Sequence, residues 1–182
     1  MAFLTALWLP ILLTGIVLFF ASFVAWTILP HHQRDWDRAP DEPALLDAVR
    51  KLNLPAGSYL FPYFSHQEAK DPANQERYRI GPRGRLDVWD EANMGRNLGL
   101  TFLHFLLVAI FTAYIGWIAM EGTAPTGWHV FRLVGAVGVL TFASSGQLHA
   151  IWFRRRTLND FLDGIVYGLL MGLIFAICWP KS

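Results

Sequence analysis

Four long apolar stretches constrain the fold of this chain more than any other feature. They are Phe3–Leu29, Leu98–Met120, Leu133–Phe153 and Phe161–Pro180. Within them, the Asp, Glu, Lys, Arg and His side chains are limited to His104, His149 and Asp163. At 1.5 Å per residue, a helix formed by any of these stretches can cross about 30 Å of hydrocarbon. The sequence therefore predicts an all-α polytopic membrane protein with four transmembrane helices.

The first stretch begins close to the N-terminus, where a cleaved signal peptide would lie. No basic residue precedes its apolar run, and the run is much longer than the apolar core of a signal peptide. We therefore expect this stretch to remain in the protein as the first transmembrane helix.

Charge is distributed unevenly along the 182 residues. Apolar residues make up 54% of the chain and charged residues only 16%, compared with about 25% charged in soluble proteins. Ten of the fifteen Lys and Arg residues lie between Pro30 and Asn97, together with most of the acidic residues. We divide the chain accordingly into transmembrane helix 1 (residues 1–30), a soluble segment (31–97) and transmembrane helices 2 to 4 (98–182).

The soluble segment carries the signals of a small α+β insert between helices 1 and 2. Asp41 and Asp71 each predict a helix start, because each is a capping residue followed within two positions by proline. Two strand-like runs are Tyr59–Phe64 and Arg85–Trp89. So few short elements cannot bury much surface alone, and we expect the segment to lean on the helix bundle, lipid headgroups or a partner.

The distribution of Lys and Arg near the membrane predicts the orientation. With four crossings, the soluble segment shares one side with Arg154–Arg156, and that side holds thirteen Lys and Arg residues, while the other holds Arg132 and Lys181. The positive-inside rule then places residues 31–97 in the cytoplasm and both termini outside. The expected location is the cell membrane, a bacterial inner membrane, with the chain as a multi-pass protein.

The outer boundary of this topology carries aromatic and charged residues. An aromatic belt is predicted there at Trp8, Trp117, Trp128 and Trp179. Glu121 and Arg132 flank the connection between the second and third helices, and we expect an ion pair between them to act as a weak clasp.

Small residues recur along the fourth helix. Gly164, Gly168, Gly172 and Ala176 are spaced every four residues and form one narrow strip. In lipid, helices associate through close van der Waals contact along such strips rather than through a hydrophobic drive. We expect the strip to pack within its own bundle, and docking onto another protein or a second copy is the alternative.

Polar residues within the spans gather toward the predicted cytoplasmic end. The side chains at similar depth there are His104, His149, Gln147 and Asp163, with His31 and His32 at the end of the first helix. Such residues are costly in hydrocarbon and mark candidate sites. They could hold a haem or metal through His104 and His149, or transfer protons between imidazole and the Asp163 carboxylate. The alternative is ordinary hydrogen bonding between helices.

No motif of high specificity for catalysis accompanies these features. The chain has no phosphate loop or CxxC, and Cys178 is its single cysteine, which excludes an intrachain disulfide and a metal site built on paired thiolates. A net charge of +1, with basic and acidic residues alternating in the soluble segment, predicts no nucleic-acid partner.

The sequence thus favours a non-catalytic accessory or scaffold subunit of a larger membrane complex. Its expected partners are the lipid bilayer and other membrane subunits or further copies of itself, and no cofactor is expected. Two alternatives stay open. One is a haem- or metal-binding membrane redox protein that uses His104 and His149, and the other is a small oligomeric transporter in which Asp163 and the histidines line the path.

Overall fold

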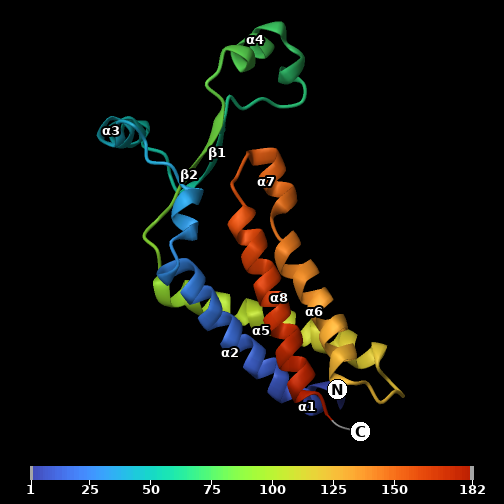
Figure 1. The fold of residues 1–182 in the computed structure, drawn as a ribbon. Coiled ribbons are helices and arrows are strands. Elements are labelled where there is room, and N and C mark those ends of the chain that lie inside the picture. The colour runs from blue at the N-terminus through green and yellow to red at the C-terminus, as the bar shows by residue number, and fades with distance from the viewer. Residues whose placement is uncertain (1, 181–182) are drawn as a thin grey trace. The chain divides into compact units, whose positions relative to one another are not determined.

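The computed structural model describes residues 2–180 and divides into two compact units (Figure 1). The helical unit runs up to Trp36 and resumes at Asn93, and the smaller unit comprises residues 37–92. The smaller unit is therefore shorter at both ends than the predicted soluble segment 31–97. Residues 31–36, which include His31 and His32, belong to the helical unit.

The helical unit is built from helices and helical turns. They are α1 (Ala2–Ala6), α2 (Trp8–Phe23), the π-turn η1 (Val24–Ile28), the 3₁₀ turn η2 (His31–Asp35), α5 (Met94–Ala119), α6 (Gly127–Ser144), α7 (Gln147–Phe153) and α8 (Leu158–Cys178). Among residues 2–180, four segments are long and apolar enough to cross a membrane, namely Trp8–Ile28, Met94–Ala119, Gly127–Phe153 and Leu158–Cys178. Large apolar side chains such as Leu140 and Ile177 point outward and are 70% and 72% exposed. Such a surface is costly in water and suits hydrocarbon.

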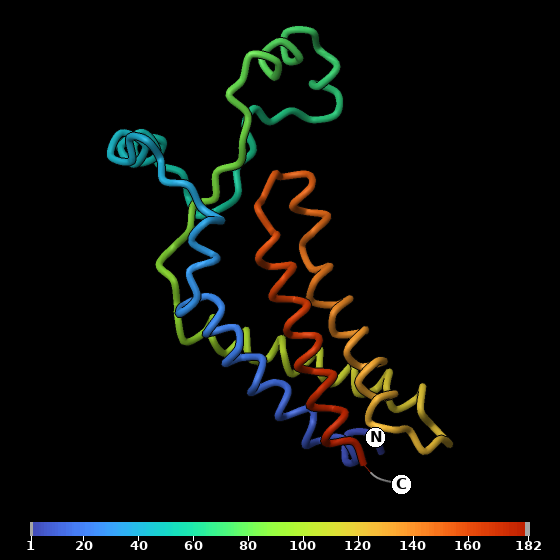
Figure 2. The backbone as a smooth tube through the Cα atoms, viewed as in Figure 1, coloured from blue at the N-terminus to red at the C-terminus, as the bar shows by residue number. Residues whose placement is uncertain are grey.

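The helix α8 lies between α2 and α6, and α5 packs against α2 (Figure 2). The buried core forms where these helices meet. Fully buried core residues are Leu18 of α2, Val134 of α6 and Phe175 of α8. The start of α2 and the end of α8 lie at one end of the bundle, and η2 lies at the other.

The first span is interrupted near its start. Hydropathy predicts one helix over Phe3–Leu29, but α1 and α2 are separated at Leu7. Pro10 explains the interruption, because its nitrogen carries no hydrogen to donate to the Ala6 carbonyl four residues earlier and its ring crowds that carbonyl. The segment that is long and apolar enough to cross a membrane therefore begins at Trp8.

The third span is also interrupted, between α6 and α7. Ser145 is extended (φ −60°, ψ 121°) and Gly146 adopts a left-handed conformation with φ 78°, which ends the helix. The break frees backbone carbonyls that lipid cannot satisfy. Gln147 compensates, since its side-chain Nε2 donates a hydrogen bond of 3.2 Å to the Ala143 carbonyl. The predicted span Leu133–Phe153 thus consists of two consecutive helices.

The glycine strip of α8 lies directly against α6. A Cβ atom on Gly164 would lie 2.5 Å from the Ala143 backbone nitrogen, and one on Gly172 would lie 2.8 Å from the Gly135 Cα. At Gly168, a Cβ would collide with the Val139 backbone. Near the end of the strip, the carbonyl of Ala176 faces Gly127 of α6. The small residues therefore bring the two helix backbones into contact.

The smaller unit contains two helices, one helical turn and a two-stranded sheet. Its elements are α3 (Glu42–Leu52), β1 (Gly57–Phe61), the 3₁₀ turn η3 (Glu68–Lys70), α4 (Pro72–Ile80) and β2 (Gly84–Val88). The predicted helix starts are confirmed, because the Asp41 and Asp71 carboxylates accept backbone N–H bonds in the first turns of α3 and α4. The strands pair antiparallel, with Gly57 opposite Val88.

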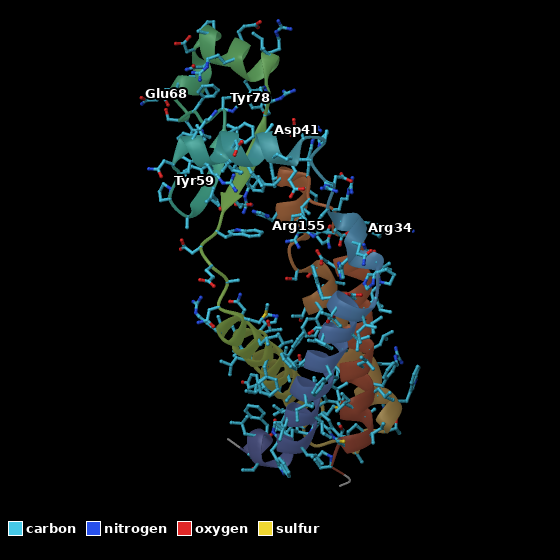
Figure 3. The ribbon with its side chains drawn as sticks, turned by 90° about the vertical axis from the view of Figure 1, so that its left-hand side faces the viewer. Arg34, Asp41, Tyr59, Glu68, Tyr78 and Arg155 are labelled. Carbon is cyan, nitrogen blue, oxygen red and sulfur yellow. The ribbon has the colours of Figure 1, made fainter. Side chains whose placement is uncertain are left out.

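Residues 37–92 contain no buried side chain. Local contacts hold the elements instead. The Tyr59 hydroxyl donates a bond of 2.8 Å to the Pro55 carbonyl, and the Arg83 guanidinium lies 4.9 Å from the centre of the Tyr78 ring. Both tyrosines are labelled in Figure 3. Helix caps, short-range contacts and one two-stranded sheet therefore hold this unit together, and a hydrophobic core does not.

The contact between α6 and α8 predicts a steric effect of Gly168→Ala. The added methyl group forces the helix backbones apart, and overpacking of this kind costs about 1–3 kcal/mol. We expect a lower free energy of unfolding, measured by denaturant titration in mixed micelles. Gly99→Ala in α5 is the matched control, because a Cβ there meets no atom within 4 Å. Equal stabilities of the two variants would contradict the role of the contact.

Candidate functional site

A cluster of histidine and carboxylate side chains lies at one end of the helical unit. It is formed by η2, which follows the first span, and by the first turns of α8. Pro30 precedes η2, and the 3₁₀ turn places His32 and Asp35 on the same side, since residues three apart eclipse in such a turn. Asp163 comes from α8, 131 residues after His32.

The Asp163 carboxylate lies between two imidazoles. Its Oδ1 is 3.1 Å from His31 Nε2, and its Oδ2 is 3.0 Å from His32 Nε2. One ligand atom from each of the three residues lies within 4.8 Å of the others. The His32 and Asp163 side chains are 5% and 14% exposed, and the His31 side chain is 28% exposed. The cluster is therefore largely shielded but reachable from one side.

A second set of contacts fixes the orientation of His32. Its Nδ1 lies 2.6 Å from Asp35 Oδ2, and its ring stacks on the Trp26 indole with centroids 3.8 Å apart. Asn159 Nδ2 donates to Asp35 Oδ1 at 2.8 Å and to the His31 carbonyl at 2.9 Å. Asp35 thus holds the His32 ring, and Asn159 holds both Asp35 and the His31 backbone.

The surroundings of His32 favour its positively charged form. Both of its ring nitrogens face carboxylate oxygens, which accept hydrogen bonds and do not donate them when ionised. Burial lowers the pKa of His32, but the hydrogen bonds to Asp163 and Asp35 and their negative charges outweigh burial, so its pKa is raised above the usual 6.5. The cluster therefore places a histidine with a raised pKa between two carboxylates.

The loop between α7 and α8 contacts η2 next to this cluster. Arg156 Nη1 donates a bond of 2.7 Å to the Arg34 carbonyl, and Arg155 pairs with Asp160 at 3.3 Å. Figure 3 shows Arg34 and Arg155 at the same end of the helical unit. The Thr157 hydroxyl bonds Gln147 Oε1 at 3.0 Å. Gln147 thus joins the loop to the break in the third span.

The remaining predicted site residues lie elsewhere. The His104 ring is 6.4 Å from the Phe142 ring, and the His149 ring is 4.4 Å from the Phe153 ring. Among residues 2–180, the one group of three or more potential metal ligands contains Asp163 but neither of these histidines. A haem or metal held by His104 and His149 stays a prediction.

Sequence reasoning placed His31 and His32 at the depth of Asp163 but gave them no ligand role. Asp35 and Asn159 were not identified. The available signal was the pair of consecutive histidines at the end of the first span, with an aspartate three residues after the second. That spacing predicts a local imidazole–carboxylate contact, but not which part of the chain completes it.

The donor set suits a divalent transition metal ion. Two imidazole nitrogens and one carboxylate oxygen are typical of zinc sites that bind substrate or water as a fourth ligand. Metal-bound histidines commonly donate their other ring N–H to a carboxylate, which is the relation of His32 to Asp35. Thiolate ligation is not available here, because Cys178 lies fifteen residues beyond Asp163 on α8, about 22 Å along the helix.

Comparison with known proteins gave no match. No family model, curated protein or solved structure is significantly similar to this chain. The functional assignment therefore rests on the geometry of its own residues.

Proposed function

We propose that this chain is a multi-pass membrane protein that binds one divalent transition metal ion, best fitted by Zn²⁺, through His31, His32 and Asp163. The observation that carries the proposal is the position of Asp163, whose two oxygens lie 3.1 and 3.0 Å from two different imidazole nitrogens. Tetrahedral zinc with bonds of about 2.1 Å places its ligand atoms roughly 3.4 Å apart. One ligand atom from each of the three residues lies within 4.8 Å of the others, so small side-chain shifts would bring them to that spacing.

Metal binding would compete with protons at this position. The Asp163 carboxylate faces the Nε2 atoms of His31 and His32, and a metal ion held by these residues would require both Nε2 atoms to be free of protons. Asp35 would keep its hydrogen bond to His32 Nδ1 and hold the ring in the orientation that presents Nε2. The ion would join η2 to α8 and leave a position for water or a small ligand.

The proposed metal site predicts a 1:1 stoichiometry. After removal of metal with EDTA, protein in nanodiscs should take up one Zn²⁺ by calorimetry and one Co²⁺ with visible absorption typical of four-coordinate Co²⁺. Asp163→Asn and His32→Ala should abolish this binding, and Asp35→Asn should weaken it about 10–100-fold as a positioning change.

Two controls separate this site from its alternatives. Asp160→Asn changes a carboxylate of the same helix that pairs with Arg155, and it should bind zinc like the unaltered protein. His104→Ala with His149→Ala should also have no effect. Loss of binding in this double variant, or equal uptake by His32→Ala, would overturn the assignment.

The proposed topology places the metal site in the cytoplasmic leaflet. Arg154–Arg156 lie in the loop that fastens onto η2, so the basic residues and the cluster occupy one end of the helical unit. The positive-inside rule then assigns that end, and residues 37–92 with it, to the cytoplasm of a cell with this protein in its plasma membrane or bacterial inner membrane. Both termini would lie outside.

Cysteine labelling tests this topology. In a Cys178→Ser background, a cysteine in place of Gln75 should react with a membrane-impermeant maleimide only after the cells are permeabilised. A cysteine in place of Ala124, in the connection between α5 and α6, should react in intact cells. The reverse pattern would show that the orientation is inverted.

A role as an accessory subunit is the second candidate function. The observation that favours it is the apolar stripe of α3, where Leu45, Leu46 and Leu52 are 50%, 46% and 61% exposed. A helix with such a stripe commonly lays it into an apolar groove of a partner protein. In this function, residues 37–92 would dock onto another subunit and the metal site would stabilise the membrane part.

Site-specific photo-crosslinking in native membranes tests the accessory role. A photoreactive residue in place of Leu46 should give one adduct of defined mass, because the stripe faces the partner. The same residue in place of Lys51, on the other side of α3, should give none. Equal adducts at both positions, or none at either, would count against docking through α3.

A further inference from the structure

A cavity of about 280 Å³ lies at the end of the helical unit opposite the metal site. Its walls include Trp117 and Met120 at the end of α5, Trp179 directly after α8, and Glu121 in the following loop. The two spans that border it end at Ala119 and Cys178. The cavity therefore lies just beyond the hydrocarbon, at the depth where lipid headgroups are found.

Packing holds the aromatic walls in place. Trp117, Met120 and Trp179 all contact the buried core of the helical unit. A Cβ on Gly116 of α5 would lie 3.3 Å from the Trp179 ring, so the absence of a side chain there lets the indole lie against the helix. The Trp179 backbone is extended (φ −65°, ψ 135°), which turns the chain away from the axis of α8. The side chains of Trp117, Met120 and Trp179 are therefore held by packing against the core.

Glu121 gives the cavity a negative charge. The predicted clasp with Arg132 does not form, and none of the ion pairs among residues 2–180 includes Glu121. A carboxylate beside two indoles is complementary to an organic ammonium group, because the faces of tryptophan carry negative potential and attract cations. The carboxylate adds a negative charge to the weaker attraction that the indoles exert on a cation.

We propose that this cavity binds the ammonium headgroup of a zwitterionic phospholipid from the leaflet that faces it. The indoles of Trp117 and Trp179 contact the ammonium group and its methylenes, and the Glu121 carboxylate neutralises its charge. The depth of the cavity selects a lipid as the source, since the acyl chains of a bound phospholipid continue along the apolar surfaces of α5 and α8. This proposal is independent of the metal site.

Competition between two lipids tests the proposal. The purified protein is exposed in detergent to equal amounts of phosphatidylethanolamine and phosphatidylglycerol with identical acyl chains, and the retained lipid is measured by native mass spectrometry. The unaltered protein should prefer the ethanolamine lipid about ten-fold. Glu121→Gln keeps the size of the side chain and should lower the preference to the small part that the indoles supply, and Trp179→Ala should weaken retention.

Trp128→Ala is the matched control, because Trp128 is at the same end of the protein, stacks on Phe131 and is not part of the cavity wall. It should keep the preference. Equal retention of the two lipids by the unaltered protein, or an unchanged preference in Glu121→Gln, would overturn the proposal. Tighter binding of free choline or ethanolamine than of either phospholipid would overturn the assignment of a lipid as the ligand.

Discussion

The backbone contact between α6 and α8 is the constraint on which the rest of the helical unit depends. Gly164 and Gly168 leave no space between the two helices, so the rotation of α8 about its axis is fixed by that contact. Successive residues of a helix differ by about 100° in direction. With Gly164 turned toward α6, Asp163 is turned toward η2, where it meets His31 and His32. The packing of the glycine face of α8 against α6 thus sets the position of the Asp163 carboxylate on a different face of α8.

Each of the two helix interruptions leaves backbone polar groups without helical partners, and these groups must be satisfied where water is scarce. At Leu7 the missing donor of Pro10 ends the helix near the membrane boundary. At Ser145 and Gly146 the break lies closer to the cluster, and Gln147 bonds both the freed carbonyl and Thr157. Gln147 therefore connects the second break to the loop between α7 and α8, which contacts η2.

The sequence predicted what local and periodic patterns determine. Hydropathy identified the four spans, the proline after each capping aspartate identified α3 and α4, and the four-residue spacing of glycine pointed to a close helix contact. The breaks were not predicted, because a single glycine or proline is compatible with an uninterrupted apolar helix until its neighbours are known. The cluster of His31, His32 and Asp163 was only partly predicted: these residues were placed at one depth, but 131 residues separate His32 from Asp163. A pairing over that distance depends on which helix faces meet.

The absence of buried side chains in residues 37–92 bears on how the molecule responds to heat or denaturant. Cooperative unfolding requires a shared core, and here the core belongs to the helical unit alone. The amide hydrogens of α3, α4 and the two strands would exchange with solvent through small local openings, while those of α6 and α8 would exchange only when the bundle separates. A single melting temperature would therefore describe the membrane part of this protein and not its hydrophilic part.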